Sequence, residues 1–196
     1  MAQAIAFEST HSVTQTAFRA FVEKRAQRDE YHYELLNGRV VMNPPAGYPH
    51  GEIEHRVQVA LFRLATDRGL GKVFGSSQGY ELPSGDTVEP DASFVSRERW
   101  SAMPTPGEGD FLHVVPDLVV EILSPSTSSH DRGERKAIYE RNGVREYWIL
   151  DWRSRELVLF QLSGGRFDSG TGYSEKDRGR SPVLPGLDFA IADLLP

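Results

Sequence analysis

The chain has 196 residues, which is the length of about one domain. Apolar residues make up 39% and charged residues 26%, which excludes a disordered chain. No run reaches the roughly 18 apolar residues of a membrane-spanning helix. Because there are no cysteines, disulfides, thiolate zinc sites and cysteine nucleophiles are excluded. The first residues lack the pattern of a secretory signal, so we expect a cytoplasmic protein with no membrane contact.

The charge balance bears on possible partners. The chain has 22 basic and 28 acidic residues, a net charge of −6 with neutral histidines. Proteins that coat nucleic acid without sequence preference are usually basic. Any contact with nucleic acid would therefore need a local basic patch. The acidic balance is compatible with a cation site made of carboxylates, but surface acids alone also explain it.

The first half of the chain predicts helices around a hairpin, followed by strands. Asn37-Gly38 between two apolar runs is a strong hairpin signal, because both turn residues accept positive φ. Apolar residues that recur at helical spacing indicate the helices. In chain order we expect a flexible start over 1–13, a helix over 14–28, a hairpin over 31–42, a helix over 50–68, strands over 72–82 and 87–95, and a loop over 97–114.

The second half predicts one helix among strands. Ser129 or Asp131 is the expected N-cap of this helix, and Gly143 is its expected terminator. The predicted elements are a strand over 117–123, a helix over 129–142, a strand pair over 146–152 and 156–162, a long mobile connection over 163–181, and an apolar end that docks back. Strands cluster between helices, which favours a single domain over 1–196 with an α+β or mixed α/β sheet.

Glu121 is the most informative residue of the predicted strand over 117–123. Because side chains alternate in a strand, Glu121 lies between Val119 and Leu123 on one face. Both faces are apolar, as expected of a strand that is buried on both sides. An unpaired carboxylate there costs several kcal/mol. Glu121 therefore needs a cation, a proton or an opening in the sheet, and an ordinary pair with Arg or Lys is the alternative to a functional role.

Asp91 is a second carboxylate in a similar setting. If the strands over 87–95 and 117–123 are neighbours, Asp91 and Glu121 converge on one face. Two carboxylates with waters and a phosphate oxygen form the all-oxygen site that suits Mg²⁺ or Mn²⁺. Lys136, in the following helix, could stabilise charge on a bound phosphate. Taken alone, Asp91 reads as a turn residue and Lys136 as a solvated helix lysine.

Four runs of the sequence resemble a large bacterial family of restriction endonucleases, formerly a domain of unknown function, within the PD-(D/E)XK nuclease superfamily. They are YELLNGRVV, VEPDASFV, PDLVVEILSPSTSSHDRGERKAIYERNGVREYWILD and PVLPGL. The resemblance covers about residues 30–196 and is most specific around 117–151. It implies a restriction-endonuclease-like core: a central mixed sheet flanked by helices, with an extra N-terminal hairpin and C-terminal strands.

The resemblance also implies roles for individual residues. Asp91 and Glu121 correspond to the metal-binding acids of two core strands, and the backbone carbonyl of Leu123 would be a natural third ligand. The superfamily lysine would fall at Leu123, so Lys136 in the next helix is the implied replacement. Two further positions match family-typical residues. They are Glu34, an auxiliary acid or a plain strand residue, and His50, a phosphate or metal contact or a structural histidine.

We therefore expect a Mg²⁺- or Mn²⁺-dependent endonuclease that hydrolyses nucleic acid, most readily DNA, without a covalent intermediate. The resemblance implies a homodimer, because cutting two strands needs two sites. One alternative is a non-catalytic homodimeric interaction or nucleic-acid-sensing module that keeps the fold. A further alternative is a metal hydrolase for a small phosphoester, which would have a closed pocket.

Overall fold

The protein was analysed as a computed structural model that describes residues 7–25, 31–124 and 131–196. Its centre is a seven-stranded mixed sheet with the order β11-β10-β9-β8-β7-β4, and β12 also pairs with β10. Only β8 and β9 are parallel to each other in this sheet. The strands are β4 (Gly71–Gly75), β7 (Ala92–Ser96), β8 (Leu118–Ile122), β9 (Glu146–Asp151), β10 (Glu156–Ser163), β11 (Arg166–Phe167) and β12 (Thr171–Ser174).

A smaller five-stranded sheet and a two-stranded sheet complete the strands. The five-stranded sheet has the order β1-β3-β2-β6-β5. Its strands are β1 (Phe7–Glu8), β2 (His32–Leu36), β3 (Arg39–Asn43), β5 (Tyr80–Glu81) and β6 (Thr87–Val88), while the third sheet joins β13 (Arg178–Arg180) to β14 (Asp188–Ala190). The predicted hairpin is confirmed, because Asn37 and Gly38 at its turn both have positive φ.

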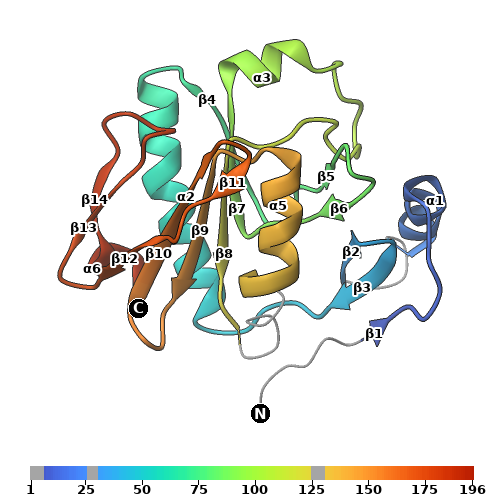
Figure 1. Cartoon of the computed structure of the whole chain (residues 1–196), viewed down its shortest axis with the longest axis horizontal. Helices are drawn as coiled ribbons and strands as arrows, with labels where there is room; N and C mark the ends of the chain where they lie inside the picture. Colours follow the sequence, from blue (N-terminus) through green and yellow to red (C-terminus); the bar gives the residue numbers. More distant parts are fainter. Residues whose placement is uncertain (1–6, 26–30, 125–130) are drawn as a thin grey trace.

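Helices cover both faces of the central sheet (Figure 1). The long helix α2 lies on one face and α5 on the other, while α1 packs beside the hairpin of the smaller sheet. The helices are α1 (Gln15–Arg25), α2 (His50–Asp67), α3 (Arg97–Ala102), the π-helical turn η1 (Asp131–Arg135), α5 (Lys136–Asn142) and α6 (Ile191–Leu194). The mixed α and β architecture with a central mixed sheet confirms the predicted fold class.

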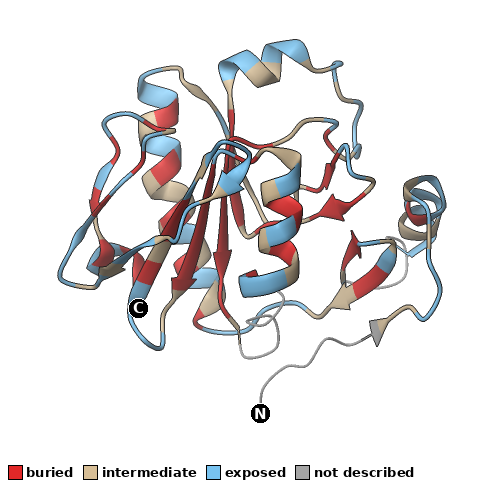
Figure 2. Cartoon of the chain, viewed as in Figure 1, coloured by how far each residue is buried: buried red, intermediate tan, exposed pale blue. Residues whose placement is uncertain are grey.

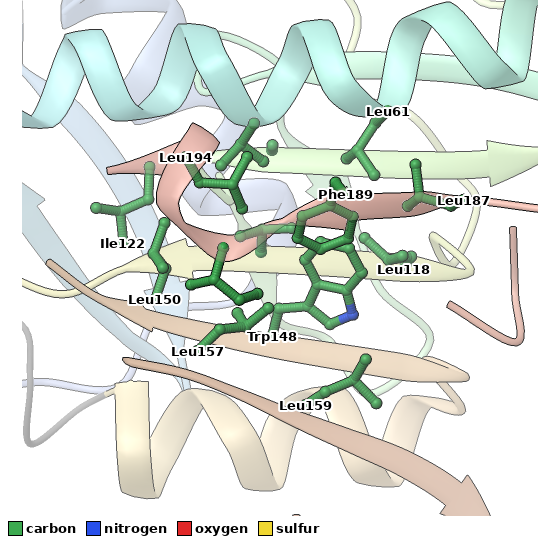
Figure 3. Close-up of a cluster of buried hydrophobic side chains, with 14 of the residues drawn as sticks. Leu61, Leu118, Ile122, Trp148, Leu150, Leu157, Leu159, Leu187, Phe189 and Leu194 are labelled. Carbon is green, nitrogen blue, oxygen red and sulfur yellow. The ribbon is translucent and has the colours of Figure 1, made fainter. Parts of the chain in front are cut away.

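Strand β8 is buried along its whole length at the centre of the molecule (Figure 2). Leu118, Val120 and Ile122 face the core under α2, whereas Val119 faces the core under α5. This alternation confirms the predicted strand that is buried on both sides. Figure 3 shows Leu118 and Ile122 beneath α2, together with Trp148 of β9. Glu121 consequently lies on the α5 face of a fully covered strand.

Two predicted strands each divide between the two sheets. The segment 72–82 forms β4 in the central sheet and then β5 in the smaller one. The segment 87–95 forms β6 in the smaller sheet and then β7 in the central one. Pro90 lies at this second crossing, where the lack of a backbone N–H suits a break in the ladder. The crossing places Asp91 immediately before β7.

The expected loop over 97–114 begins with a short helix. Ser96 caps α3, since its side-chain oxygen accepts a hydrogen bond from the Arg99 N–H at 3.3 Å. Farther on, Leu112 forms a bridge with Tyr80. The sequence reading missed α3 because the proline and glycine residues that follow it dominated the pattern.

The structure differs in part from the predictions for the first residues and for the segment 163–181, and it describes only part of two predicted helices. Phe7–Glu8 pairs with β3, so the expected flexible start contains a strand. The segment 163–181, expected to be a long connection, contains β11, β12 and β13. The N-cap candidate Ser129 and the end of the predicted helix over 14–28 lie outside the described residues, whereas Gly143 ends α5 with φ 80° as predicted.

The apolar C-terminal segment docks on the central sheet, as predicted. Leu187, Phe189 and Leu194 pack in the core between α2 and the sheet (Figure 3). Glu146 fixes this segment from β9: its carboxylate accepts hydrogen bonds from the Ser181 hydroxyl at 3.0 Å and the Val183 N–H at 3.1 Å. None of the described helices is long and apolar enough to cross a membrane.

We predict that Glu146→Gln lowers the free energy of unfolding by about 1–3 kcal/mol. The other carboxylate oxygen accepts the indole N–H of Trp148, so both oxygens of Glu146 face donors. The amide NH₂ group of glutamine would meet a donor in either orientation. Calorimetric melting of the variant measures the loss, with Glu156→Gln at an exposed position of β10 as the control. Equal melting temperatures for the Glu146 variant and the wild type would contradict this account.

Candidate active site

A cavity of about 280 Å³ lies where the two sheets meet the start of α2. Its lining combines acidic residues, two histidines and one arginine. The charged and histidine side chains that line it are His32, Glu34, His50, Glu54, Glu89, Asp91, Glu121 and Arg135. The predicted residues Glu34, His50, Asp91 and Glu121 are thus brought together, although they come from four separate segments of the chain.

Asp91 and Glu121 meet through the pairing of β7 with β8. The antiparallel register joins Ala92 to Val120, so the next step places Asp91 opposite Glu121. Residues directly opposite each other share one face of a sheet. The Asp91 carboxylate also accepts a hydrogen bond from the Ile122 N–H at 2.7 Å. The predicted adjacency of the two strands is confirmed, and it fixes one carboxylate beside the other.

The surroundings of Glu121 favour the protonated form of its carboxyl group. Its side chain is 4% exposed, and one carboxylate oxygen accepts the Tyr139 hydroxyl at 2.6 Å. Burial raises the pKa of Glu121 well above its usual range, against the opposing charge of Arg135. The nearby acids Asp131, Asp91 and Glu34 raise it further. Glu121 therefore takes up a proton more readily than an exposed glutamate.

The backbone oxygen in the cavity belongs to Ile122. We expected the carbonyl of Leu123, but that oxygen faces Arg153 at 3.5 Å, and the Leu123 N–H bonds to Leu150 on β9. Since N–H and C=O groups of successive strand residues point to opposite sides, Ile122 presents its groups toward Asp91 instead. Its carbonyl lies 3.2 Å from His50 Nε2. The structure therefore places Ile122, and not Leu123, at the cavity.

His50 stands at the first position of α2 and reaches two oxygens of the site. Its Nε2 lies 3.3 Å from Asp91 Oδ2 as well as close to the Ile122 carbonyl. Burial alone would lower the pKa of His50, but the charge of Asp91 and the hydrogen bond to it outweigh this and raise it. The Nδ1 atom is buried and has no hydrogen-bond partner among the described residues. His50 thus presents its Nε2 atom to Asp91 and Ile122, two residues that line the cavity.

Glu34 and Arg135 form a buried ion pair at the back of the cavity. Glu34 accepts hydrogen bonds from the Arg135 guanidinium, the Asn43 amide at 3.0 Å and the Glu89 N–H at 3.1 Å. Arg135 also binds Asp131, one turn earlier in η1. Burial opposes the charge of Arg135, but the surrounding carboxylates raise its pKa well above the usual value. The guanidinium therefore stays charged.

Lys136 does not join the other predicted residues. Its ammonium lies 3.6 Å from the centroid of the Phe160 ring, on β10, and Lys136 does not line the cavity. Adjacent residues of a helix point about 100° apart, so the inward direction of Arg135 turns Lys136 away. Among the described residues that line the cavity, the structure therefore places Arg135 and not Lys136.

The sequence reading missed Arg135, the Tyr139 hydroxyl that binds Glu121, and the pair of Glu89 with His32. A signal for the first two existed: Asp131, Arg135 and Tyr139 follow one another at four-residue spacing, which places them on one helical face. His32 Nδ1 lies 3.0 Å from Glu89, and this hydrogen bond raises the pKa of His32. No short sequence pattern predicts the pair of His32 and Glu89, because His32 belongs to β2 whereas Glu89 lies between β6 and β7.

The donor set fits a hard divalent cation in its chemistry. Asp91, Glu121 and the Ile122 carbonyl offer oxygen ligands, as Mg²⁺ and Mn²⁺ prefer. Among residues 7–25, 31–124 and 131–196, however, no three His, Asp or Glu side chains are already arranged to hold a metal ion. One oxygen of Glu121 accepts the Tyr139 hydroxyl, and the raised pKa of Glu121 opposes metal binding, because a carboxylate binds a metal ion only in its ionised form.

Comparison with known families decides the class of protein. The family model described as "Uma2: Putative restriction endonuclease" matches residues 18–192, and this range includes all the residues that line the cavity. The chain belongs to the Uma2 family. This confirms the resemblance to restriction endonucleases seen in the sequence and assigns the Uma2 chain to a nuclease-type family.

Individual proteins are also similar to this chain in fold or in sequence. An Anabaena variabilis protein, whose crystal structure is described as that of "a putative nuclease belonging to DUF820", shares the fold with a TM-score of 0.74. The two are 17% identical, and the match covers 93% of this chain and 97% of that one. Uncharacterized protein slr1290 of Synechocystis sp. is 34% identical over 77 residues. That match spans 39% of the Uma2 chain and only 40% of the Synechocystis protein.

We predict that Glu121→Gln stabilises the protein at pH 8 and has little effect near pH 4. The raised pKa means that the folded wild type binds a proton more tightly than the unfolded chain. The wild type therefore loses stability as the pH rises above the unfolded pKa of about 4.3, until the folded pKa is passed. Glutamine cannot ionise, and its carbonyl can still accept the Tyr139 hydroxyl.

Melting temperatures of both proteins across this pH range test the prediction. The difference should grow with pH and then level off. The exposed Glu156→Gln variant serves as a control, for which we expect no such divergence. A Glu121→Gln variant that is less stable than the wild type at pH 8 would contradict the prediction. It would show that the folded protein stabilises the ionised carboxylate.

Proposed function

We propose that this Uma2 protein is a divalent-metal-dependent endonuclease that hydrolyses phosphodiester bonds of DNA in the cytoplasm. The observation that carries the proposal is the pairing of β7 with β8, which sets Asp91 opposite Glu121 and beside the backbone of Ile122. Oxygen donors converging at the end of a buried strand form a site for metal-assisted phosphoryl chemistry. Membership of the Uma2 family supports the same class of reaction.

Asp91, Glu121 and the Ile122 carbonyl would hold Mg²⁺ or Mn²⁺. When bound, such an ion polarises a phosphate oxygen and lowers the pKa of a bound water. His50 Nε2 lies beside Asp91 and Ile122, so it would either complete the ligand set or donate a hydrogen bond to the phosphate. Glu34 acts on the site indirectly, because it binds and orients Arg135.

In the reaction we propose, a water oxygen attacks the phosphorus directly. The bond from phosphorus to the leaving sugar oxygen breaks, and that oxygen takes up a proton. No covalent enzyme intermediate is needed. Arg135 is charged and buried, so it offsets negative charge in the cavity where water screens it weakly. This assigns Arg135 the part that the sequence reading gave to Lys136.

A homodimer is part of the proposal, because a nuclease that cuts both strands of a duplex needs two sites. Symmetric dimers with one repeated interface are the commonest oligomers of soluble proteins.

A second candidate function is a nucleic-acid-binding module without catalysis. The position of Lys136 favours it, since the ammonium lies over Phe160 instead of among the carboxylates. The binding of Arg135 to both Glu34 and Asp131 also points this way, because much of its charge is already neutralised. Cleavage assays separate the two candidates.

We predict metal-dependent cleavage of plasmid DNA that is lost in Asp91→Ala and Glu121→Ala. Removal of either carboxylate should lower the rate at least about 100-fold, because ligand loss weakens both metal binding and catalysis. Gel analysis of supercoiled plasmid with Mg²⁺ or Mn²⁺ measures nicking, and Glu156→Gln controls for preparation effects. Intact plasmid and intact single-stranded DNA under all metal and salt conditions, or equal rates in every variant, would favour the binding module.

We also predict that Arg135→Met lowers the cleavage rate by about 10²–10³-fold, whereas Lys136→Met stays close to the wild type. Arg135→Lys, which keeps a cation, should restore part of the lost rate. The double variant Arg135→Met with Glu34→Gln removes the charge of one of the two buried carboxylates that bind Arg135, and so tests for a folding defect. A large loss in Lys136→Met with a normal melting temperature would return the catalytic role to Lys136.

A further inference from the structure

A few large aromatic side chains of the described residues remain exposed. Among the described residues, the large hydrophobic side chains that remain exposed are Tyr31 at 41%, Tyr48 at 86% and Phe62 at 55%. Tyr31 and Tyr48 belong to segments that line the cavity, whereas Phe62 lies on α2. Exposure of a large aromatic ring beside a functional cavity is informative, because such rings usually bury their apolar surface.

Tyr48 lies on the rim of the cavity. The loop that joins β3 to α2 passes the end of β8 (Figure 1), and it lines the cavity with Pro45 and Ala46 before Tyr48 and with His50 after it. Tyr48 itself is not a lining residue and points to solvent. A hydrogen bond of 3.0 Å from the His50 N–H to the Gly47 carbonyl closes the loop around it. The phenol ring is therefore presented outward from an anchored turn.

The backbone of Tyr48 lies close to residues of the proposed site. Two residues of chain span at most about 7 Å, so the backbone of Tyr48 is within that distance of His50. The His50 imidazole in turn lies 3.3 Å from Asp91. Tyr31 is at the same end of the hairpin, because it precedes His32, which pairs with Asn43 and lines the cavity. Tyr31 and Tyr48 thus each lie within two residues of a residue that lines the cavity.

The charge of the cavity opposes binding through phosphates alone. Five carboxylates line it against one arginine and two histidines, and the whole chain carries a net charge of −6. Binding of duplex DNA draws mainly on neutralisation of phosphates by Lys and Arg. Stacking of a base on an aromatic ring needs no such charge and contributes about 1–3 kcal/mol per base. Only an unpaired base offers its face for stacking.

We propose that Tyr48 stacks on an unpaired nucleobase beside the phosphate in the cavity, so that the protein prefers single-stranded DNA to duplex DNA. This inference rests on the proposed nuclease function and deepens it. Tyr48 is a positioning residue: the stacked base fixes the neighbouring phosphodiester over Asp91 and Glu121.

Fluorescence anisotropy with a labelled single-stranded oligonucleotide, and with its duplex, tests the proposal. EDTA prevents cleavage while the wild-type protein is titrated. We expect the single strand to bind at least about tenfold more tightly than the duplex. Tyr48→Ala should weaken single-strand binding by about 5- to 150-fold, the equivalent of one stacked base. Tyr48→Phe should keep wild-type affinity, because the ring and not the hydroxyl stacks.

Phe62→Ala is the matched control. Phe62 is also an exposed aromatic residue, and it lies about 18 Å along α2 from His50, by the rise of a helix. Its removal should leave binding unchanged. A 2-aminopurine in the single strand reports stacking directly: its fluorescence should fall on binding to the wild type and to Tyr48→Phe, but not to Tyr48→Ala. A merely structural role of Tyr48 would not produce this pattern.

The outcomes separate this inference from the nuclease proposal. Cleavage of single-stranded DNA at equal rates by the wild type and Tyr48→Ala would overturn the stacking role and leave the nuclease intact. Tyr48-dependent binding of single strands without cleavage in any metal would support the stacking role and overturn the nuclease. Equal affinity of Tyr48→Ala and Phe62→Ala for the single strand would overturn the inference.

Discussion

The buried guanidinium of Arg135 is the interaction on which the arrangement of the site depends. It binds Glu34 from the smaller sheet and Asp131 from η1, and its charge acts on Glu121 of the central sheet. Without a cation among them, these carboxylates would repel one another in a region of weak screening. Arg135 thus links the smaller sheet, η1 and the central sheet around the cavity. The same charge opposes the rise in the pKa of Glu121 and so bears on the group that would bind a metal.

The parts of the site that follow from strand geometry could be predicted from the sequence. Alternation along β8 placed Glu121 correctly, and the pairing of two apolar strands brought Asp91 beside it. Helical geometry was less decisive. Both Arg135 and Lys136 can align with Tyr139, at spacings of four and three residues, and both spacings occur on one helical face. The contact with Glu34, which lies 101 residues away in sequence, distinguishes Arg135 from Lys136 as a residue of the cavity.

Long-range pairing explains the other differences. Glycine-rich and charged residues over 163–181 carry little local preference for strands, yet β11 and β12 both pair with β10. The segments 72–82 and 87–95 read as continuous strands because their apolar pattern does not record a change of sheet. Similarly, the choice between the Ile122 and Leu123 carbonyls depends on which neighbour lies on each side of β8. Such information resides in the assembled sheet and not in any short window.

The two crossings between the sheets have a consequence for folding. Because β4 and β7 belong to one sheet while β5 and β6 between them belong to the other, neither sheet can be completed from one continuous stretch of chain. Leu35 of β2, for example, pairs with Thr87 of β6. Loops of this length must close before the pairing stabilises them, which makes folding slow and cooperative. We therefore expect local opening of the hairpin to disassemble the cavity together with the sheet that supports it, so that the protein passes between an assembled state and an unfolded one with few partly active forms.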